Sequence, residues 1–232
     1  MSETLDQYTR LAALFTYPDA GLAGRVREVQ AFLDNACAEA SGDLKDFAEF
    51  TSHTALLDLE ELYTRSFDVK AITTLDLGYV LFGDDYKRGE LLVHLNDEHR
   101  QAGVECGGEL PDHLPNLLKL LDAMQKPELR EELVQKIIGP ALRKIIGEFD
   151  PDRLKKKNAA YVKHYKTLID RSESYGTIYR GPLRALYAVL ESDFDVGADH
   201  EPDAVREDRF LNSIRTEMRL ECNEGKCHGA TE

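Results

Sequence analysis

The stretch that decides the fold is LPNLLKLLDAM, residues 114–124. Its apolar side chains at positions 114, 117, 118, 121 and 124 recur at the spacing of one face of an α-helix. Helical spacing also occurs over residues 5–15 and 26–36. A strict alternation of apolar and polar residues over a strand length is hard to find. The sequence therefore predicts an all-α fold, a single-domain helical bundle.

Breakers and capping residues divide this pattern into helices. Pro18 with Gly21 ends the first helix, and Ser41-Gly42 ends the second, so that Asp43 becomes an N-cap. Pro140 lies inside an apolar helical pattern, where a kink or a break is expected. Further helices are predicted over residues 44–67 with a break near Ser52, 74–81, 85–102 capped by Asp84, 112–124, 128–147, 151–171, 182–190 and 203–220.

Length and charge restrict the class of protein. With 232 residues we expect a main helical domain over residues 1–171, a C-terminal helical segment over 172–220 and a tail over 221–232. The net charge of −14 disfavours a surface for nucleic acid or for an anionic membrane. No apolar run approaches the roughly 20 residues of a membrane span, and the N-terminus lacks a signal-peptide pattern. We therefore expect a cytoplasmic protein.

One basic segment interrupts the acidic chain. Residues 126–170 carry 11 basic and 7 acidic side chains, whereas the rest of the sequence is net negative. A solvated helix face is the ordinary explanation for such a segment. A patch that binds an anion or a partner is the alternative.

Signatures of enzymes are missing from the sequence. It contains no dinucleotide or phosphate loop, no nucleophile elbow and no H-E-x-x-H motif. Cys222, Cys227 and His228 form C-x4-C-H, a partial metal site at most, because a closed zinc site needs four ligands. Cys106 lies near His113 in sequence, but nothing marks its thiol as activated. We expect no enzymatic activity, and a small metal-binding protein using the Cys222 cluster is an alternative.

Aromatic and acidic side chains gather in two stretches instead. The first, residues 62–89, places five aromatic rings among carboxylates. Such a mixture suits a groove that binds an apolar peptide helix with positive charge, although each ring could equally belong to the core. The second stretch is LPDHLP, residues 110–115, in which two prolines fix the backbone around Asp112 and His113.

These stretches resemble the NarJ branch of the TorD/DmsD/NarJ family, the cytoplasmic assembly chaperones of molybdenum oxidoreductases, also called nitrate reductase delta subunits. The similarity extends from about Leu11 to Leu142. It is carried by LEELYTRSFDV (59–69), TTL (73–75), YVLFGDDYKRGE (79–90) and ELPDHLPNLLKLL (109–121).

The resemblance implies a chaperone that binds the N-terminal segment of a catalytic subunit, which is a twin-arginine signal or its remnant. Such a chaperone holds the apoenzyme for insertion of molybdopterin guanine dinucleotide, a cofactor of the client and not of the chaperone. The sequence leaves open the identity of the client, among nitrate reductase and related enzymes, and whether the protein is a monomer or a dimer. A generic helical adaptor is the alternative function.

The family motifs also imply which residues bind the client. The P-D-H-L-P and F-G…R-G matches supply two signature segments, and Tyr63, Phe67 and Tyr79 are expected to line or support the groove. Asp68, Asp84 and Asp112 are expected to contact client arginines, although Asp112 and Arg88 could equally form a structural ion pair. The full predicted set is Tyr63, Phe67, Asp68, Tyr79, Phe82, Gly83, Asp84, Tyr86, Arg88, Gly89, Asp112, His113 and Pro115.

Overall fold

The computed structural model of the chain describes residues 6–155, 176–194 and 196. All of these belong to one compact unit that ends at Val196, while a second unit, residues 197–232, lies outside the described residues. The described residues form helices and no strand, which confirms the all-α prediction. None of their helices has the length and hydropathy needed to cross a membrane.

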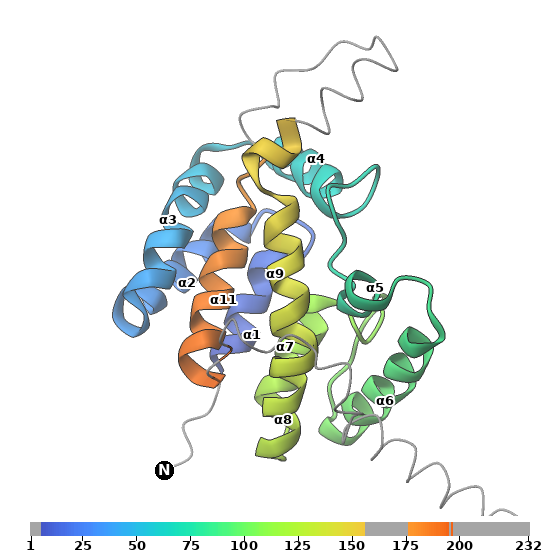
Figure 1. Cartoon of the computed structure of the whole chain (residues 1–232). Coiled ribbons are helices and arrows are strands. Elements are labelled where there is room, and N and C mark those ends of the chain that lie inside the picture. Colours follow the sequence, from blue (N-terminus) through green and yellow to red (C-terminus); the bar gives the residue numbers. More distant parts are fainter. Residues whose placement is uncertain (1–5, 156–175, 195, 197–232) are drawn as a thin grey trace, which may run out of the picture. The chain divides into compact units, whose positions relative to one another are not determined.

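Figure 1 shows the order of the elements along the chain. They are α1 (Gln7–Ala12), the short turn η1 (Ala13–Phe15), α2 (Leu22–Ala36), α3 (Ala38–His53), α4 (Leu56–Phe67), α5 (Leu77–Phe82), α6 (Tyr86–Ala102), α7 (Leu114–Ala123), α8 (Pro127–Leu133), the π-helical η2 (Val134–Ile138), α9 (Gly139–Glu148) and α11 (Arg180–Phe194). The predicted helix over 151–171 is described only as far as residue 155, and the one over 203–220 lies outside the described residues.

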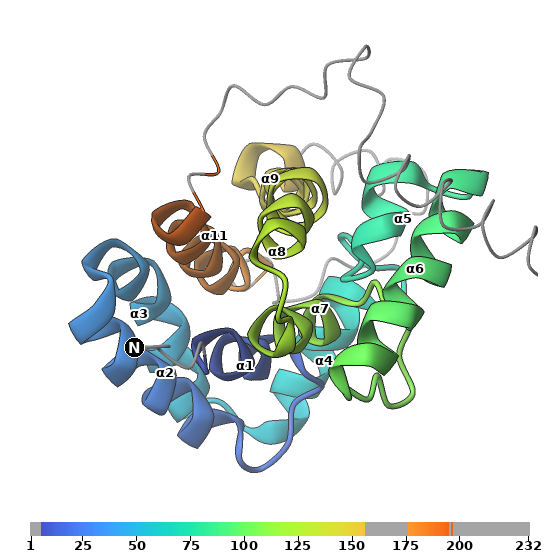
Figure 2. The same ribbon diagram turned by 90° about the horizontal axis from the view of Figure 1, so that it is seen from below.

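Helix α7 lies at the centre of the core. The four leucines of its predicted apolar stripe are 0% exposed, and Met124 is 7% exposed. Leu120, outside that stripe, is also fully buried, so α7 is covered on more than one side. It packs against α1 and α6, as Figure 2 shows from below. Each buried leucine contributes about 1.5–3 kcal/mol to folding, so α7 fixes the position of its neighbours.

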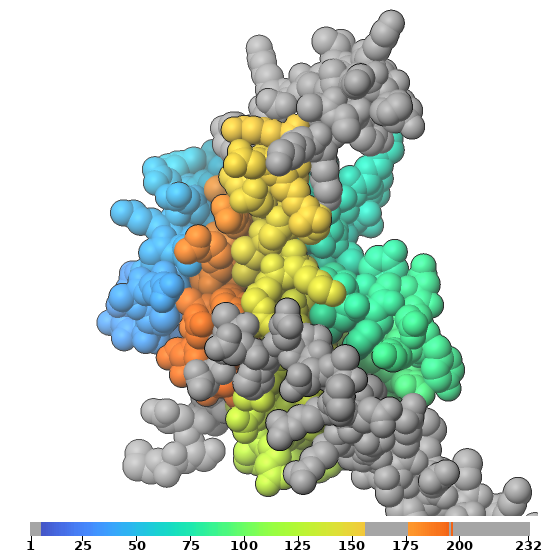
Figure 3. Space-filling model, in the orientation of Figure 1, coloured from blue at the N-terminus to red at the C-terminus, as the bar shows by residue number. Residues whose placement is uncertain are grey.

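Helix α11 joins distant parts of the chain, because it packs against both α3 and α9. Its close approach to α3 depends on Gly181, where a Cβ would lie 2.5 Å from the carbonyl oxygen of Asp43. Arg184 adds an ion pair with Asp43 at 3.1 Å. Figure 3 shows α9 at the surface between α11 and α5.

The predicted break at Ser41-Gly42 is wrong. The chain instead interrupts at Cys37, which is extended (φ −151°, ψ 101°), and α3 continues through residues 41–43. Ser41 lies inside the helix because its hydroxyl donates to Asp34 at 2.5 Å and accepts from Gln30 at 2.8 Å, both on α2. These contacts between helices outweigh the low helix propensity of the Ser-Gly pair.

Two helix starts near the candidate site also differ from prediction. Helix α5 begins at Leu77 and not at residue 74, because Asp76 pairs with His113 in an antiparallel bridge. The N-cap of α6 is Asp85 and not Asp84, since the Asp85 carboxylate accepts a hydrogen bond from the backbone N–H of Lys87 at 2.9 Å.

The chain remains helical through Pro140, where a kink or break was expected. The local adjustment is the π-helical turn just before it, in which the N–H of Gly139 donates to the carbonyl of Val134, five residues back. A wider turn accommodates a proline ring that a regular α-helix would exclude. Val196 packs onto this turn, and a Cβ on Gly139 would overlap its side chain.

Candidate functional site

An open cleft with a volume of about 1060 Å³ lies among α4, α5, α7 and α9. The connection from α4 to α5 contributes six residues, from Asp68 to Asp76. Helix α7 contributes Pro115, Asn116 and Lys119, and His113 lies just before its first residue. Tyr79 enters from α5, Lys144 from α9 and Tyr17 from the link between α1 and α2. The cleft therefore combines residues that are up to 137 positions apart in the sequence, from Thr16 to Arg153.

Six of the predicted client-binding residues line this cleft: Tyr63, Phe67, Asp68, Tyr79, His113 and Pro115. The others lie elsewhere among the described residues. Asp84, Tyr86 and Gly89 are exposed around the start of α6, and Phe82 and Gly83 are half-buried at the end of α5. Arg88 and Asp112 lie behind the cleft, where they pair with each other.

The loop before α7, which contains the P-D-H-L-P motif, is joined beside the cleft to the segment before α5 through backbone hydrogen bonds. The N–H of Leu77 donates to the carbonyl of Asp112 at 2.9 Å, and the N–H of Leu114 donates to that of Leu75 at 2.9 Å. These bonds flank the bridge between Asp76 and His113. The loop before α7 and the segment before α5 are thereby held in one register.

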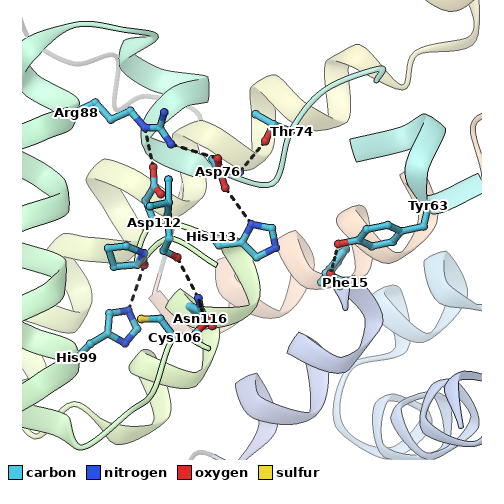
Figure 4. A network of polar contacts seen from close by, with 12 residues as sticks. Phe15, Tyr63, Thr74, Asp76, Arg88, His99, Cys106, Asp112, His113 and Asn116 are labelled. Atoms are coloured by element: carbon cyan, nitrogen blue, oxygen red, sulfur yellow. Dashed lines mark hydrogen bonds and ion pairs between the residues drawn. The ribbon is translucent and has the colours of Figure 1, made fainter. Parts of the chain in front are cut away.

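Side-chain charges reinforce the same junction (Figure 4). Asp76 accepts from Nδ1 of His113 at 3.0 Å and from Arg88 at 3.2 Å, and the Nε of Arg88 donates to Asp112 at 3.1 Å. Burial raises the pKa of Asp112, which the ion pair with Arg88 opposes. The side chain of Asp112 is 0% exposed. Asp112 therefore forms the structural ion pair with Arg88, because its buried carboxylate is out of reach of a client arginine.

Asp76 holds His113 at the cleft, and its charge predicts a pH dependence. The hydrogen bond from His113 lowers the pKa of Asp76, and the charges of His113 and Arg88 lower it further against the opposing effect of burial. Folding therefore favours the ionised form of Asp76. The stabilisation of the fold by this charge is present above the ordinary pKa of 3.8, and it is lost as the pH falls through the lower pKa that Asp76 has in the folded protein. We expect Asp76→Asn to reduce stability at pH 6, and the difference from wild type to shrink between pH values of about 4 and 2.

Urea unfolding of both proteins across this pH range measures the effect. Asp97→Asn is the matched control, because Asp97 pairs with Arg100 on the outer part of α6 and its side chain is 44% exposed. A constant difference between Asp76→Asn and wild type down to pH 2 would show that the charge of Asp76 does not stabilise the fold.

Tyr63 and Phe67 belong both to the core and to the cleft. Each is 7% exposed, and their rings lie 5.3 Å apart, edge to face. The hydroxyl of Tyr63 donates to the carbonyl of Phe15 at 3.0 Å. Phe67 also packs against Tyr179 and Phe149, with ring centroids at 4.9 and 5.7 Å. One edge of an aromatic core is therefore exposed to the cleft, so that core packing and lining of the cleft are compatible for these two rings.

Two exposed tyrosines extend this aromatic surface. Tyr79 is 44% exposed and lies under the guanidinium of Arg88, 5.2 Å from the ring centre. Tyr17 is 54% exposed and stands edge to face on Tyr63 at 5.5 Å. Sequence reasoning missed Tyr17 and Asp76. An aspartate within an otherwise uncharged run (TTLDLGYV, 73–80) was the signal available for Asp76, and no pattern marks Tyr17.

The chemistry of the cysteines does not suggest a catalytic or metal centre in the described part of the chain. Cys106 lines the cleft, but burial raises the pKa of its thiol, which disfavours the reactive thiolate. The described residues contain no group of three or more His, Cys, Asp or Glu side chains placed to hold a metal. Cys222, Cys227 and His228 lie outside them.

Comparison with known proteins supports the resemblance that the motifs carry. No family model matches the chain. The chain is 32% identical over 136 residues to the nitrate reductase molybdenum cofactor assembly chaperone NarJ of Escherichia coli K12, covering 57% of each chain. It is 25% identical over 187 residues to the probable chaperone of the same name from Bacillus subtilis, covering 80% of this chain and 88% of the relative. The match thus spans little more than half the length of the Escherichia coli relative.

Proposed function

We propose that the protein is an assembly chaperone for a molybdenum oxidoreductase of the nitrate reductase type. It acts in the cytoplasm, has no cofactor and no catalytic step of its own, and binds the N-terminal segment of the apo catalytic subunit in the cleft. The observation that carries this proposal is the cleft itself, which lies beside the junction of the P-D-H-L-P loop with the segment that leads into α5. The similarity to relatives that are named as chaperones of this kind supports it.

The surface of the cleft suits a peptide. Tyr17 and Tyr79 present exposed rings at the opening, while Tyr63 and Phe67 form a rigid base. Exposed tyrosines on a rigid support supply contact area at a small cost in conformational entropy, which is why they are frequent in protein-binding sites. A volume of about 1060 Å³ is at the upper end for a drug-sized ligand and accommodates several side chains of one helix face.

A calorimetric titration tests this proposal directly. The probe is a synthetic peptide of the first ~30 residues of the molybdenum subunit encoded next to this gene, long enough for a helix to cross the cleft. We expect micromolar or tighter binding, and weaker binding of a peptide in which the arginines are replaced by alanine. Absence of binding to the unmodified peptide would contradict the proposed function.

Replacing Tyr79 by alanine is expected to weaken peptide binding about tenfold, because an exposed tyrosine that a partner covers is a typical hot spot. The expected change in unfolding free energy is below about 1 kcal/mol, since the ring contributes mainly its contact with Arg88. Val93→Ala is the control, because Val93 is 54% exposed on α6 and does not line the cleft. Equal losses of affinity in the two variants would argue against binding in this cleft.

A further inference from the structure

Charges of both signs line the cleft, although the sequence predicted an acidic groove. Two of the lining carboxylates are neutralised within the protein: Asp76 pairs with Arg88 and His113, and Glu148 pairs with Arg153 at 2.6 Å. Four other charged residues of the lining, Asp68, Glu109, Lys119 and Lys144, form no ion pair with another described residue. The cleft therefore offers two negative and two positive side chains to an occupant.

The unpaired acids act together on one part of the cleft. Burial raises the pKa of the Tyr63 phenol, and the negative charges of Glu109, Asp68 and Asp76 raise it further. Asp68 and Glu109 are exposed, so each can turn toward a ligand near Tyr63. This part of the cleft favours a cationic side chain.

Lys144 lines a different part of the cleft. It extends from α9 to α5, where its ammonium group donates to the carbonyl of Val80 at 3.5 Å. This long hydrogen bond is a weak one. The two residues of α5 that line the cleft, Tyr79 and Val80, carry no charge. An acidic side chain of an occupant that packs on Tyr79 would therefore find a cation beside it.

We propose, on the basis of the chaperone function above, that the bound client segment carries both signs of charge. Its basic side chains contact Asp68 and Glu109, and an acidic side chain contacts Lys144. A purely basic segment would leave Lys144 covered and unpaired near like charges, which costs binding free energy. The two signs also fix the direction in which the segment lies in the cleft.

The test uses the ~30-residue client peptide in two forms, one unmodified and one in which every Asp and Glu is replaced by its amide. We expect the amide form to bind wild type about fivefold more weakly, as for the loss of one partly exposed ion pair. Lys144→Met should bind the unmodified peptide about fivefold more weakly and should no longer distinguish the two forms. Lys45→Met, on the exposed surface of α3, should distinguish them as wild type does.

The outcomes separate this inference from the proposed function. Equal binding of the two peptides to wild type, or a client segment without any acidic residue, would overturn the two-signed contact and leave the chaperone function in place. Failure of the unmodified peptide to bind would overturn both. A fivefold preference that persists in Lys144→Met would show that the acidic side chain contacts another group, and would also overturn the assignment to Lys144.

Discussion

Replacing Arg88 by methionine is expected to lower the free energy of unfolding by about 3–5 kcal/mol, because it leaves a buried carboxylate without its cation. Asp112 has a fully buried side chain, and one of its oxygens has no hydrogen-bond partner even with Arg88 present. Asp76 would lose the same arginine. Denaturation by urea, followed by circular dichroism, measures the loss.

A double variant distinguishes the charge of Asp112 from the packing of Arg88. Arg88→Met combined with Asp112→Asn removes the orphaned charge while keeping nearly the same volume, so we expect it to recover much of the stability. Lys87→Met, at an exposed neighbouring position, should change stability by less than about 0.5 kcal/mol. A double variant as unstable as Arg88→Met alone would show that lost packing causes the effect.

The second large effect is expected from Phe67→Ala, with a loss of about 3–5 kcal/mol. The ring packs between Tyr63, Tyr179 and Phe149, with centroid distances from 4.9 to 5.7 Å. Its removal leaves a cavity that the three neighbouring rings cannot fill completely, because Tyr63 is held in place by its hydrogen bond to the carbonyl of Phe15. Chemical denaturation again provides the measurement.

Peptide binding by Phe67 variants needs a substitution that keeps the fold. Phe67→Leu retains most of the volume, so we expect a smaller stability loss and a measurable affinity. A loss of less than about 1 kcal/mol in Phe67→Ala would show that the ring contributes to the cleft surface more than to the core.

The sequence predicts the helices whose determinants are local. The apolar stripe of α7 follows from side-chain spacing alone, and Pro127 begins α8 as expected of a first-turn proline. The interruption at Cys37 was missed because Ser41 is held in α3 by groups of α2. The late start of α5 was missed because it depends on a bridge to His113, 37 residues away.

The candidate site shows the same division. The aromatic stretch and the P-D-H-L-P loop could be predicted as parts of a candidate site because their residues are close in sequence. Tyr17 and Lys144 come from two other elements, and only packing brings them to the cleft. Whether Asp112 faces a ligand or Arg88 also depends on burial, a property of the folded chain that its neighbours in sequence do not determine.

The π-helical turn at residues 134–138 sets the rotational phase of everything that follows it in α9. One residue advances an α-helix by about 100°, and a π turn absorbs one residue more than an α turn. A chain shorter by one residue here could form an uninterrupted α-helix, although the ring of Pro140 would then disrupt one regular turn. Lys144 and Glu148 would then lie about 100° around the helix axis and would leave the cleft. The one additional residue in this π turn thus determines which face of α9 lines the cleft.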